Sequence, residues 1–366
     1  FVDGPEFTVT IIDNDAYPII GLKPADSHRL YDYEAKYIAN DTQYLLPCGL
    51  SSSEEDIVKN IALRAYQSLG CTGWGRVDVM QDQNDDFWDI QDALSHAGFK
   101  STYQFKPGWQ AIAHGEWSID LGNNGDFGKA RQVYVALDSP IGQFGLGKQR
   151  PVQYTLIAEY VDIFNHRSSP FAYDVESPFF VNNLVTYENQ ISDFKFMIGG
   201  QFDGDSDDDF ADFINTGLGY SRNGLHLALT YSRQNDYNQQ QLKIGKTEVV
   251  AGMAALDISD NLYAAIAYQD VDYQRVNSRS GSTLDVSLAY RFHPLYRAKL
   301  GFFDFDDGNS KLETKSHQGA NLTFEWLPSD NLRFHLEYLT KDFDALNDTQ
   351  SISVGFRYDY SQQWAY

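Results

Sequence analysis

The chain has 366 residues, a formal net charge of −23 and two cysteines, Cys48 and Cys71. This length is enough for two ordinary domains or one large barrel. The acidic charge argues against nucleic acid as the main partner, because phosphates bind clustered Lys and Arg, and two cysteines in the first quarter exclude a disulfide framework for the rest of the chain.

Hydropathy excludes one further class. No run of roughly 18 apolar residues occurs, so an ordinary transmembrane helix is not expected, whereas a membrane β-barrel is allowed because its lipid-facing residues alternate with polar ones. No signal peptide is visible, and we expect a mature chain or a fragment. The 24 Tyr and 24 Phe residues lie mostly after residue 96, which indicates two unlike parts.

The first part, residues 1–88, mixes two periodicities. "EFTVTIID" and "AYPIIGL", separated by a polar turn, predict a β-hairpin. Ser52 and Glu55 form a capping box before an amphipathic segment that stops at Gly70, which predicts one helix. "WGRVDVMQD" then predicts a strand. This order suits an α+β nucleotide-binding lobe.

The blocks "GPEFTV", "YDYEAKY", "QYLLPCGLS" and "GCTGWGRVDVMQD" resemble D-alanine:D-alanine ligase, an ATP-grasp enzyme, over nearly all of residues 1–88. The resemblance implies that Glu6 and Lys36 bind ATP, Lys36 at the phosphates, and that Tyr37 belongs to the active-site hydrogen-bond group. It also implies that Arg76 stabilises the transferring phosphoryl group and that Asp78 holds Mg²⁺, roles that suit phosphoryl transfer. Without the resemblance, Arg76 and Asp78 form an ordinary surface ion pair on a strand.

The resemblance stops short of the catalytic residues. Where the family carries a second metal carboxylate, an Asn and a Ser-Pro-Gly-Met turn, this chain has "DDFW" followed by "DIQDALSHAGF". One Mg²⁺ carboxylate without its partner cannot neutralise the bridged phosphates, so ligase activity is not expected. Residues 1–88 are predicted to be an inactive fragment that needs ATP and Mg²⁺ only if it were functional, and residues 89–96 to be a junction.

The second part, residues 97–366, alternates apolar and polar residues with a period of two. In "NLYAAIAY" and "LRFHLEY", for example, the apolar residues share one face, and the opposite faces of such segments carry charged residues such as Asp285, Lys299, His335 and Glu337. We count about 15 strands. The alternation fits a soluble sandwich as well as a membrane barrel.

Connection lengths separate these two folds. Short turns at "KPG", "SPIG", "ISD", "RNG", "SDN", "HPL" and "PSDN" alternate with long polar connections at 122–130, 151–178, 203–213, 235–241, 275–283 and 307–319. Short turns on one rim and long loops on the other are typical of an outer-membrane barrel. Aromatic residues near strand ends, such as Tyr231 and Trp326, are expected at the membrane interfaces.

At "AGFKSTYQFKPGWQAIAHGEWSIDL", "ARQVYVALDSPIGQFGLGKQR" and "SVGFRYDY", residues 97–366 resemble the Gram-negative general porins, starting at the family's second strand. The resemblance implies a water-filled, 16-stranded barrel that needs no cofactor, forms homotrimers, contacts outer-membrane lipid and lipopolysaccharide, and passes small hydrophilic solutes and ions. The predicted fold class is therefore mainly all-β: an antiparallel transmembrane β-barrel with about 15 of 16 strands, preceded by a small α+β ATP-grasp fragment.

The resemblance also implies that a long loop, here 151–178, folds into the lumen as a constriction. Its acidic candidates are Asp162, Asp174 and Glu176, its basic flanks are Arg131, Lys148 and Arg150, and further lumen-wall candidates are Arg291, Arg297, Arg333 and Arg357. Arg131 shares parity with Val133, so alternation places it in the lumen only if Tyr134 faces lipid. For the loop acids, an ordinary solvated loop is the alternative.

Two further features of the sequence are an acidic segment and the missing strand of the barrel. "DGDSDDDFAD" at 203–212 has Asp at alternate positions but lacks the Gly and Glu of a calcium loop, so we interpret it as a solvated loop. A barrel that lacks one strand would leave an unpaired edge in lipid. Either the strand "EFTVTIID" closes this edge, or the chain joins two unrelated genes.

Three functions follow in order of preference. The leading hypothesis is an outer-membrane porin for passive diffusion. The second is a D-alanine:D-alanine ligase, present only as an inactive and otherwise cytoplasmic fragment. The third is a soluble β-rich binding protein, which leaves the strand-end aromatic residues and the two kinds of connection unexplained.

Overall fold

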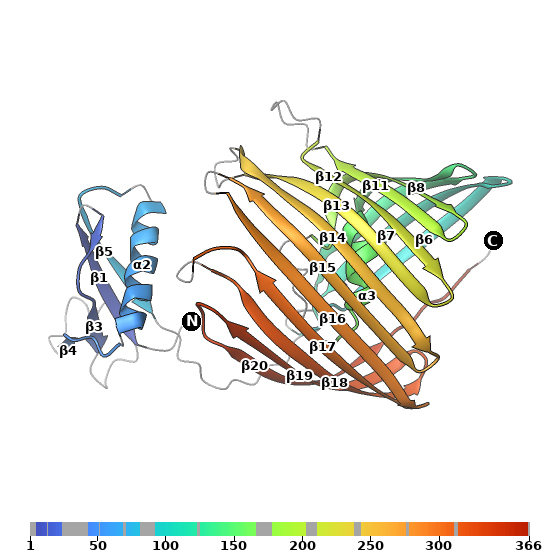
Figure 1. Cartoon of the computed structure of the whole chain (residues 1–366). Coiled ribbons are helices and arrows are strands. Elements are labelled where there is room, and N and C mark those ends of the chain that lie inside the picture. The colour runs from blue at the N-terminus through green and yellow to red at the C-terminus, as the bar shows by residue number, and fades with distance from the viewer. Residues whose placement is uncertain are drawn as a thin grey trace. The chain divides into compact units, whose positions relative to one another are not determined.

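The computed structural model describes residues 5–12, 14–23, 43–50, 52–68, 71–80, 92–122, 125–165, 178–202, 211–237, 243–275, 278–310 and 314–364. The chain divides into two compact units, unit 1 at Phe1–Asp89 and unit 2 at Ile90–Tyr366 (Figure 1). In the described ranges no helix is both long and apolar enough to cross a membrane.

Unit 1 is a small antiparallel sheet with one helix packed on it. Its elements are β1 (Glu6–Ile12), β2 (Asp15–Ala16), β3 (Ile20–Lys23), β4 (Gln43–Leu45), α2 (Ser52–Ser68) and β5 (Trp74–Met80). Phe7, Val9 and Ile11 alternate along β1 and are buried with Ala62 and Tyr66 of α2. The hairpin, helix and strand predicted from the sequence are therefore confirmed.

The central strand of unit 1 is paired along both edges. Phe7 is opposite Gly21 of β3 on one edge and Val79 of β5 on the other. A strand with two occupied edges has no backbone groups left for a further neighbour. The suggestion that "EFTVTIID" closes the gap in the barrel is therefore wrong.

Unit 2 is a sheet of 15 antiparallel strands in chain order, as the sequence predicted. The strands are β6 (His96–Lys106), β7 (Trp109–Ile119), β8 (Phe127–Ser139), β9 (Gly142–Gln149), β10 (Val181–Ile191), β11 (Phe194–Gln201), β12 (Phe213–Arg222), β13 (Leu225–Tyr237), β14 (Lys243–Ser259), β15 (Leu262–Gln274), β16 (Arg279–His293), β17 (Tyr296–Asp306), β18 (His317–Ser329), β19 (Leu332–Phe343) and β20 (Thr349–Tyr358). Figure 1 shows that these strands form one strongly curved sheet.

The connections alternate in length, which confirms the predicted asymmetry of the two rims. Two-residue turns join β6 to β7, β8 to β9, β10 to β11, β12 to β13, β14 to β15, β16 to β17 and β18 to β19. Every other connection between neighbouring strands of this sheet is longer. The predicted loop at 275–283 is shorter than expected because β16 already begins at Arg279, and the connection at 344–348 was not predicted.

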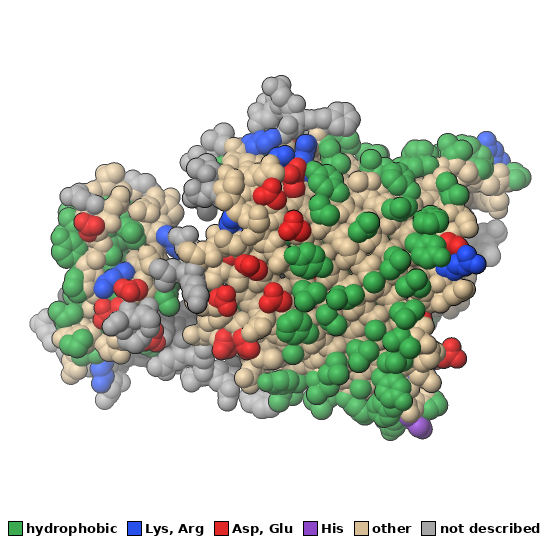
Figure 2. All heavy atoms as spheres, in the orientation of Figure 1, with side chains coloured by type: hydrophobic (Ala, Val, Ile, Leu, Met, Phe, Trp, Pro, Cys, Tyr) green, Lys and Arg blue, Asp and Glu red, His purple; other side chains and the backbone are tan. Residues whose placement is uncertain are grey.

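The period of two separates an apolar outer face from a polar inner one. On β15, Ile266 and Tyr268 are about half exposed, whereas Ala265, Ala267 and Gln269 between and beyond them are buried. Hydrophobic side chains are accordingly spread over the strands in Figure 2. A soluble sandwich would bury these apolar side chains, so their outward orientation is the arrangement of a membrane barrel.

The sheet has two ends, β6 and β20. Both strands run from the rim of long connections to the rim of two-residue turns, so they are parallel to each other. In the described part of the chain no strand pairs with the outer edge of either. One further strand, antiparallel to both, would complete the even number found in single-chain barrels.

The connection from β9 to β10 folds against the inner face of the sheet. We call residues 151–165 the inner loop. It contains a π-helical segment, η1 (Tyr154–Ala158), and a short helix, α3 (Glu159–Val161). Leu156, Ile157 and Val161 pack in one buried cluster with small wall residues such as Ala251 and Ala265. Residues 151–165 of the loop predicted at 151–178 thus fold inward, while 166–177 lie outside the described residues.

The connection from β17 to β18 is organised by one carboxylate. Asp307 is almost fully buried and accepts hydrogen bonds from the Thr314 hydroxyl at 2.7 Å and from the backbone N–H groups of Asn309 and Lys315, each at 3.0 Å. Burial acts to raise the pKa of Asp307, but these hydrogen bonds outweigh it and lower the pKa to about 2.

We expect this carboxylate to contribute stability that is lost in acid. The pKa of Asp307 is lower in the folded chain than in the unfolded one, so the contribution is complete above about pH 4 and disappears as the pH falls toward 2. Asp307→Ala should lower the free energy of unfolding by about 2 kcal/mol at pH 7. Denaturant unfolding across a pH series measures the difference, which should narrow toward pH 2.

Asp330 in the turn between β18 and β19 provides the control. Asp330→Ala should change stability by less than about 0.5 kcal/mol at any of these pH values. An equal loss in both variants, or a loss for Asp307→Ala that does not shrink in acid, would contradict the role assigned to Asp307.

Candidate functional site

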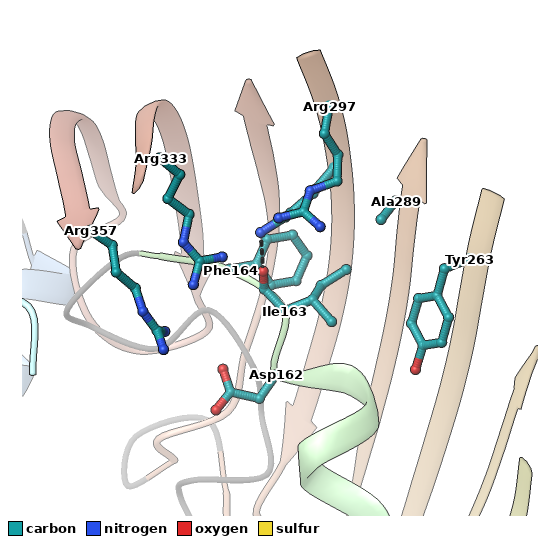
Figure 3. A pocket seen from close by; sticks show the side chains of 9 residues that line it. Asp162, Ile163, Phe164, Tyr263, Ala289, Arg297, Arg333 and Arg357 are labelled. Carbon is teal, nitrogen blue, oxygen red and sulfur yellow. Dashed lines mark hydrogen bonds between the residues drawn. The ribbon is translucent and has the colours of Figure 1, made fainter. Parts of the chain in front are cut away.

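The end of the inner loop and the facing wall of the sheet enclose a pocket of about 280 Å³ (Figure 3). From the loop it is lined by Asp162, Ile163 and Phe164. From β15, β16, β17, β19 and β20 it is lined by Tyr263, Ala289, Arg297, Lys299, Arg333 and Arg357. An acidic loop residue therefore faces a wall that contains three arginines and a lysine.

Three carbonyl groups of the inner loop, those of residues 160, 161 and 163, are held by three successive strands. The donors on β15, β16 and β17 are a tyrosine hydroxyl, a serine hydroxyl and a lysine ammonium group. The pairs are Tyr263 to Tyr160 at 2.6 Å, Ser287 to Val161 at 2.8 Å, and Lys299 to Ile163. The loop backbone therefore crosses the inner face of the sheet in a fixed path.

Asn165 extends this path to β18 and β19. Its backbone N–H donates to Oε2 of Glu337 at 3.1 Å, and its side-chain amide donates to Oε1 of Glu325 at 2.8 Å. Both carboxylates are fully buried. The loop thus closes over two buried acids, and it supplies part of the hydrogen bonding that those acids require.

Cations complete the surroundings of Glu325. Lys299 Nζ lies 2.6 Å from Oε1 and Arg297 Nε lies 2.6 Å from Oε2. The Lys299 side chain is 2% exposed and Glu325 is 0% exposed, so this pair is shielded from solvent. Glu337 is held instead by Thr323 at 2.7 Å and by Asn321. A buried ion pair is tolerated when its remaining hydrogen-bonding positions are filled in this way.

The basic side chains around the pocket are exposed at its surface, whereas the carboxylate that neutralises part of their charge is buried. Arg297, Arg333 and Arg357 keep 31%, 21% and 54% of their side chains exposed, whereas Glu325 is buried beneath them. Asp162 accepts a hydrogen bond from the Tyr154 hydroxyl at 3.1 Å. Burial raises the pKa of the Asp162 carboxyl above its ordinary value, and burial together with the nearby Asp162 carboxylate raises that of Tyr154.

Two of the predicted basic flanks meet at another place. The Arg150 guanidinium lies 3.8 Å from the centre of the Tyr154 ring and 4.9 Å from that of Phe180, and Arg131 lies 5.1 Å from the same Phe180 ring. Arg131 Nε also donates to Glu116 at 2.7 Å. Arg150 therefore contacts the start of the inner loop through Tyr154, Arg131 contacts Phe180 and Glu116, and neither arginine lines the pocket.

The position of Arg131 depends on an irregularity that alternation could not show. Val133 is 40% exposed on the outer face, so regular alternation would turn Arg131 outward as well. The pairing shifts between Glu116 and Trp117, which are opposite Gln132 and Ala130. Arg131 is the extra residue of this bulge, and its side chain reaches the inward-facing Glu116.

The predicted position of Lys148 at the pore constriction is wrong. It is directly opposite Val133 on the outer face, which it shares with Val135 and Leu146. Lys148 therefore does not line the lumen. The sequence position next to the loop was the reason for the prediction, but strand parity decides where a side chain points.

The remaining candidates are dispersed. Arg291 lies near the two-residue turn after β16, outside the pocket, while Asp174 and Glu176 fall outside the described residues. Lys299, Glu325 and Asn165 were not proposed as site residues. Polar residues at the inward positions of "NLTFEW" were the available signal for Glu325, because Asn321 and Thr323 alternate there with apolar residues.

The ligase-like candidates lie in unit 1. Glu6 opens β1, and Lys36 and Tyr37 fall outside the described residues. Arg76 Nε lies 3.1 Å from Asp78 Oδ1 on the exposed strand β5, as in a surface ion pair. Among the described residues no group of three or more acidic, His or Cys side chains is arranged to hold a metal ion.

Comparison with known proteins distinguishes the two parts. The model of the family described as Gram-negative porin matches residues 71–365, and the model described as D-ala D-ala ligase C-terminus matches residues 1–113. The porin match spans most of the chain. The chain belongs to the Gram-negative porin family. In this porin, the inner loop and the pocket lie inside the barrel.

Solved outer-membrane proteins share the fold at low sequence identity. The anion-selective porin from Comamonas acidovorans is 15% identical, with a TM-score of 0.59 over 97% of this chain and 98% of that one. OmpT of Vibrio cholerae in its trimer form is 16% identical, with a TM-score of 0.59 over 75% and 94%. The outer membrane channel DcaP of Acinetobacter baumannii is 12% identical, with a TM-score of 0.58 over 96% and 93%.

The ligase similarity is strong but short. The D-alanine--D-alanine ligases of Marinomonas sp. (strain MWYL1) and Psychrobacter sp. (strain PRwf-1) are 67% and 52% identical over 91 residues, which is 25% of this chain. The match spans 29% and 27% of the length of these ligases. Unit 1 is therefore similar to a fragment of a ligase.

The buried pair beneath the pocket gives a test of how the loop is held. Glu325→Gln removes the carboxylate that neutralises Lys299, so the lysine stays buried without its closest counter-ion. We expect a loss of about 3–5 kcal/mol in the free energy of unfolding, the usual cost of breaking a buried pair from one side. Denaturant unfolding of the refolded barrel, followed by tryptophan fluorescence, measures it.

Glu188→Gln is the matched control, since Glu188 pairs with Lys195 at 3.0 Å on the opposite part of the wall with both side chains about one third exposed. That pair should be worth about 1 kcal/mol or less. Similar losses in the two variants would show that Glu325 is not the buried anchor described above.

Proposed function

We propose that this porin mediates passive diffusion of small hydrophilic solutes and ions across the outer membrane of a Gram-negative bacterium. The observation that carries the proposal is the combination of an apolar outer face with a polar inner wall, onto which the inner loop is folded and hydrogen-bonded. An apolar exterior suits lipid, and a polar interior suits water-borne solutes.

The surroundings of the barrel follow from its outer face. Exposed aromatic residues near strand ends, such as Phe292 and Trp326, suit the interfaces of a bilayer, whereas Tyr231 lies in the middle of β13. We propose that this face contacts outer-membrane lipid and lipopolysaccharide and that three copies associate. The trimer form of the similarly folded OmpT supports the last point. No part of this function requires a cofactor.

Charge near the pocket gives a mechanism for selecting solutes. Asp162 on the loop faces Arg297, Arg333 and Arg357 on the wall, so a dipolar solute that passes between them is oriented by the field. Because burial raises the pKa of Asp162, the carboxylate is neutral over a wider acidic range than an exposed aspartate. The wall arginines then act without the opposing charge of Asp162.

Conductance of the refolded full chain in a planar bilayer tests the proposal. We expect ohmic steps and a cation-to-anion permeability ratio that rises with pH through the raised pKa of Asp162, because ionisation adds a negative charge to the path. Asp162→Asn should lower the ratio several-fold at high pH, since one unit charge changes an ion's local energy by roughly 1 kcal/mol. The variant should also lack the pH-dependent step.

Asp260→Asn, in the turn between β14 and β15, removes one aspartate without changing the pocket. It should leave the ratio and its pH dependence unchanged. The absence of ohmic steps from a sample with the circular dichroism of a folded barrel would disprove the pore, and an unchanged ratio in Asp162→Asn would disprove its role in selection.

For unit 1 we propose no ligase activity, despite the 67% identity with a D-alanine--D-alanine ligase. Arg76 and Asp78 are paired with each other, and the second metal carboxylate of the family is missing from the sequence. ATP and Mg²⁺ binding by this fragment, in the cytoplasm, belongs to the alternative in which it is functional. ADP release that depends on D-alanine is expected to stay at the level of a reaction without protein; release above that level would reverse this proposal.

A further inference from the structure

Two arginines lie directly opposite each other on the inner face of the sheet. Arg333 of β19 and Arg357 of β20 are cross-strand partners, and both line the pocket. Like charges in this relation destabilise a sheet. The neighbouring inward pairs avoid the problem, since Arg297 is opposite Glu325, and Glu325 is opposite His335.

The carboxylates near the two arginines neutralise them incompletely. Asp359 lies 2.9 Å from Arg357 Nε, but it is 3.9 Å from Arg333 Nη2. Glu325 is 3.8 Å from Arg333 Nη1 and has shorter contacts, each of 2.6 Å, to Arg297 and Lys299. In the part of the chain that the structure describes, the carboxylate contacts of Arg333 are both long, so there this guanidinium lacks a close counter-ion.

The pocket leaves room for a counter-ion from solution. Its volume of about 280 Å³ far exceeds the share of one water molecule, about 30 Å³. In Figure 3, the Arg333 and Arg357 side chains extend from neighbouring strands toward the loop that carries Asp162. The Arg333 and Arg357 side chains are 21% and 54% exposed, so they are accessible to a solute in the lumen.

We propose that Arg333 and Arg357 form a binding subsite for the oxyanion group of a small solute, a carboxylate or a phosphate. Guanidinium groups present planar donor forks that match the paired oxygens of both groups. One such anion relieves the repulsion between the arginines and supplies the close contact that Arg333 lacks. With this subsite, the pore binds small oxyanions during their passage and is not an unselective channel.

The inference deepens the proposed porin function, so its test uses two readouts. Succinate and inorganic phosphate are titrated against the chloride conductance of the full chain at constant ionic strength. We expect each to reduce the current in a saturable way, and Arg333→Gln or Arg357→Gln to raise the half-blocking concentration about tenfold, the effect of losing one charge-assisted hydrogen bond. A stronger shift with one of the two probes identifies the preferred oxyanion.

Two further variants make the outcome decisive. Arg357→Lys keeps the charge but not the donor fork, so its half-blocking concentration should lie between those of the parent and Arg357→Gln. Arg222→Gln removes an arginine that pairs with Asp193 outside the pocket and should behave as the parent. A chloride current in the parent that neither probe blocks would disprove the subsite but not the pore. So would an increase of the half-blocking concentration in Arg222→Gln equal to that in the pocket variants.

The second readout does not depend on conduction. Saturation transfer from the folded protein in detergent to succinate protons, and line broadening of phosphate in ³¹P spectra, should be strong for the parent and weak for both glutamine variants. If no channel forms but these signals are present and depend on the arginines, the porin proposal fails and the subsite holds. Signals that do not differ among the folded variants reject the subsite.

Discussion

The shape of the channel depends on one buried ion pair. Lys299 donates to the carbonyl of Ile163, and Glu325 accepts from the amide of Asn165, so the two partners of the pair hold adjacent parts of the inner loop. Both side chains are almost completely removed from solvent. An apolar pair could give equal stability, but it would not fix the loop backbone, because only directional donors and acceptors do so.

The same wall accommodates the loop through its small side chains. Gly301 lies on β17 between Lys299 and Phe303, and a Cβ atom there would come within 2.4 Å of the Phe164 ring. Ala251 and Ala265 play a similar part beneath Leu156 and Ile157. The small inward residues therefore let the loop pack closely against the wall, and the buried charged residues fix its position there.

Most of this fold could be predicted from local sequence patterns. Features that depend on contacts between distant residues could not. Alternation in segments such as "NLYAAIAY" determines which side chains face outward, and the turn sequences determine where strands end, so strand count and rims could be read from the sequence. Arg131 and Lys148 show the limit, because a bulge and the strand register decide their directions. The contact between Asn165 and Glu337 joins residues 172 apart, and no local pattern contains it.

One discontinuity accounts for what both parts lack. The ligase-like part has the strand of Arg76 and Asp78, but the sequence after it lacks the second metal carboxylate. The barrel begins at β6, which is the end of its sheet, and the porin resemblance begins at the family's second strand. The junction that the sequence predicts at residues 89–96 would explain both losses, the second metal carboxylate of the ligase-like part and the first strand of the barrel. Because β6 and β20 are parallel, the two edges cannot be joined as antiparallel neighbours, and a strand that runs opposite to both is needed to close the wall on which the arginines of the pocket stand.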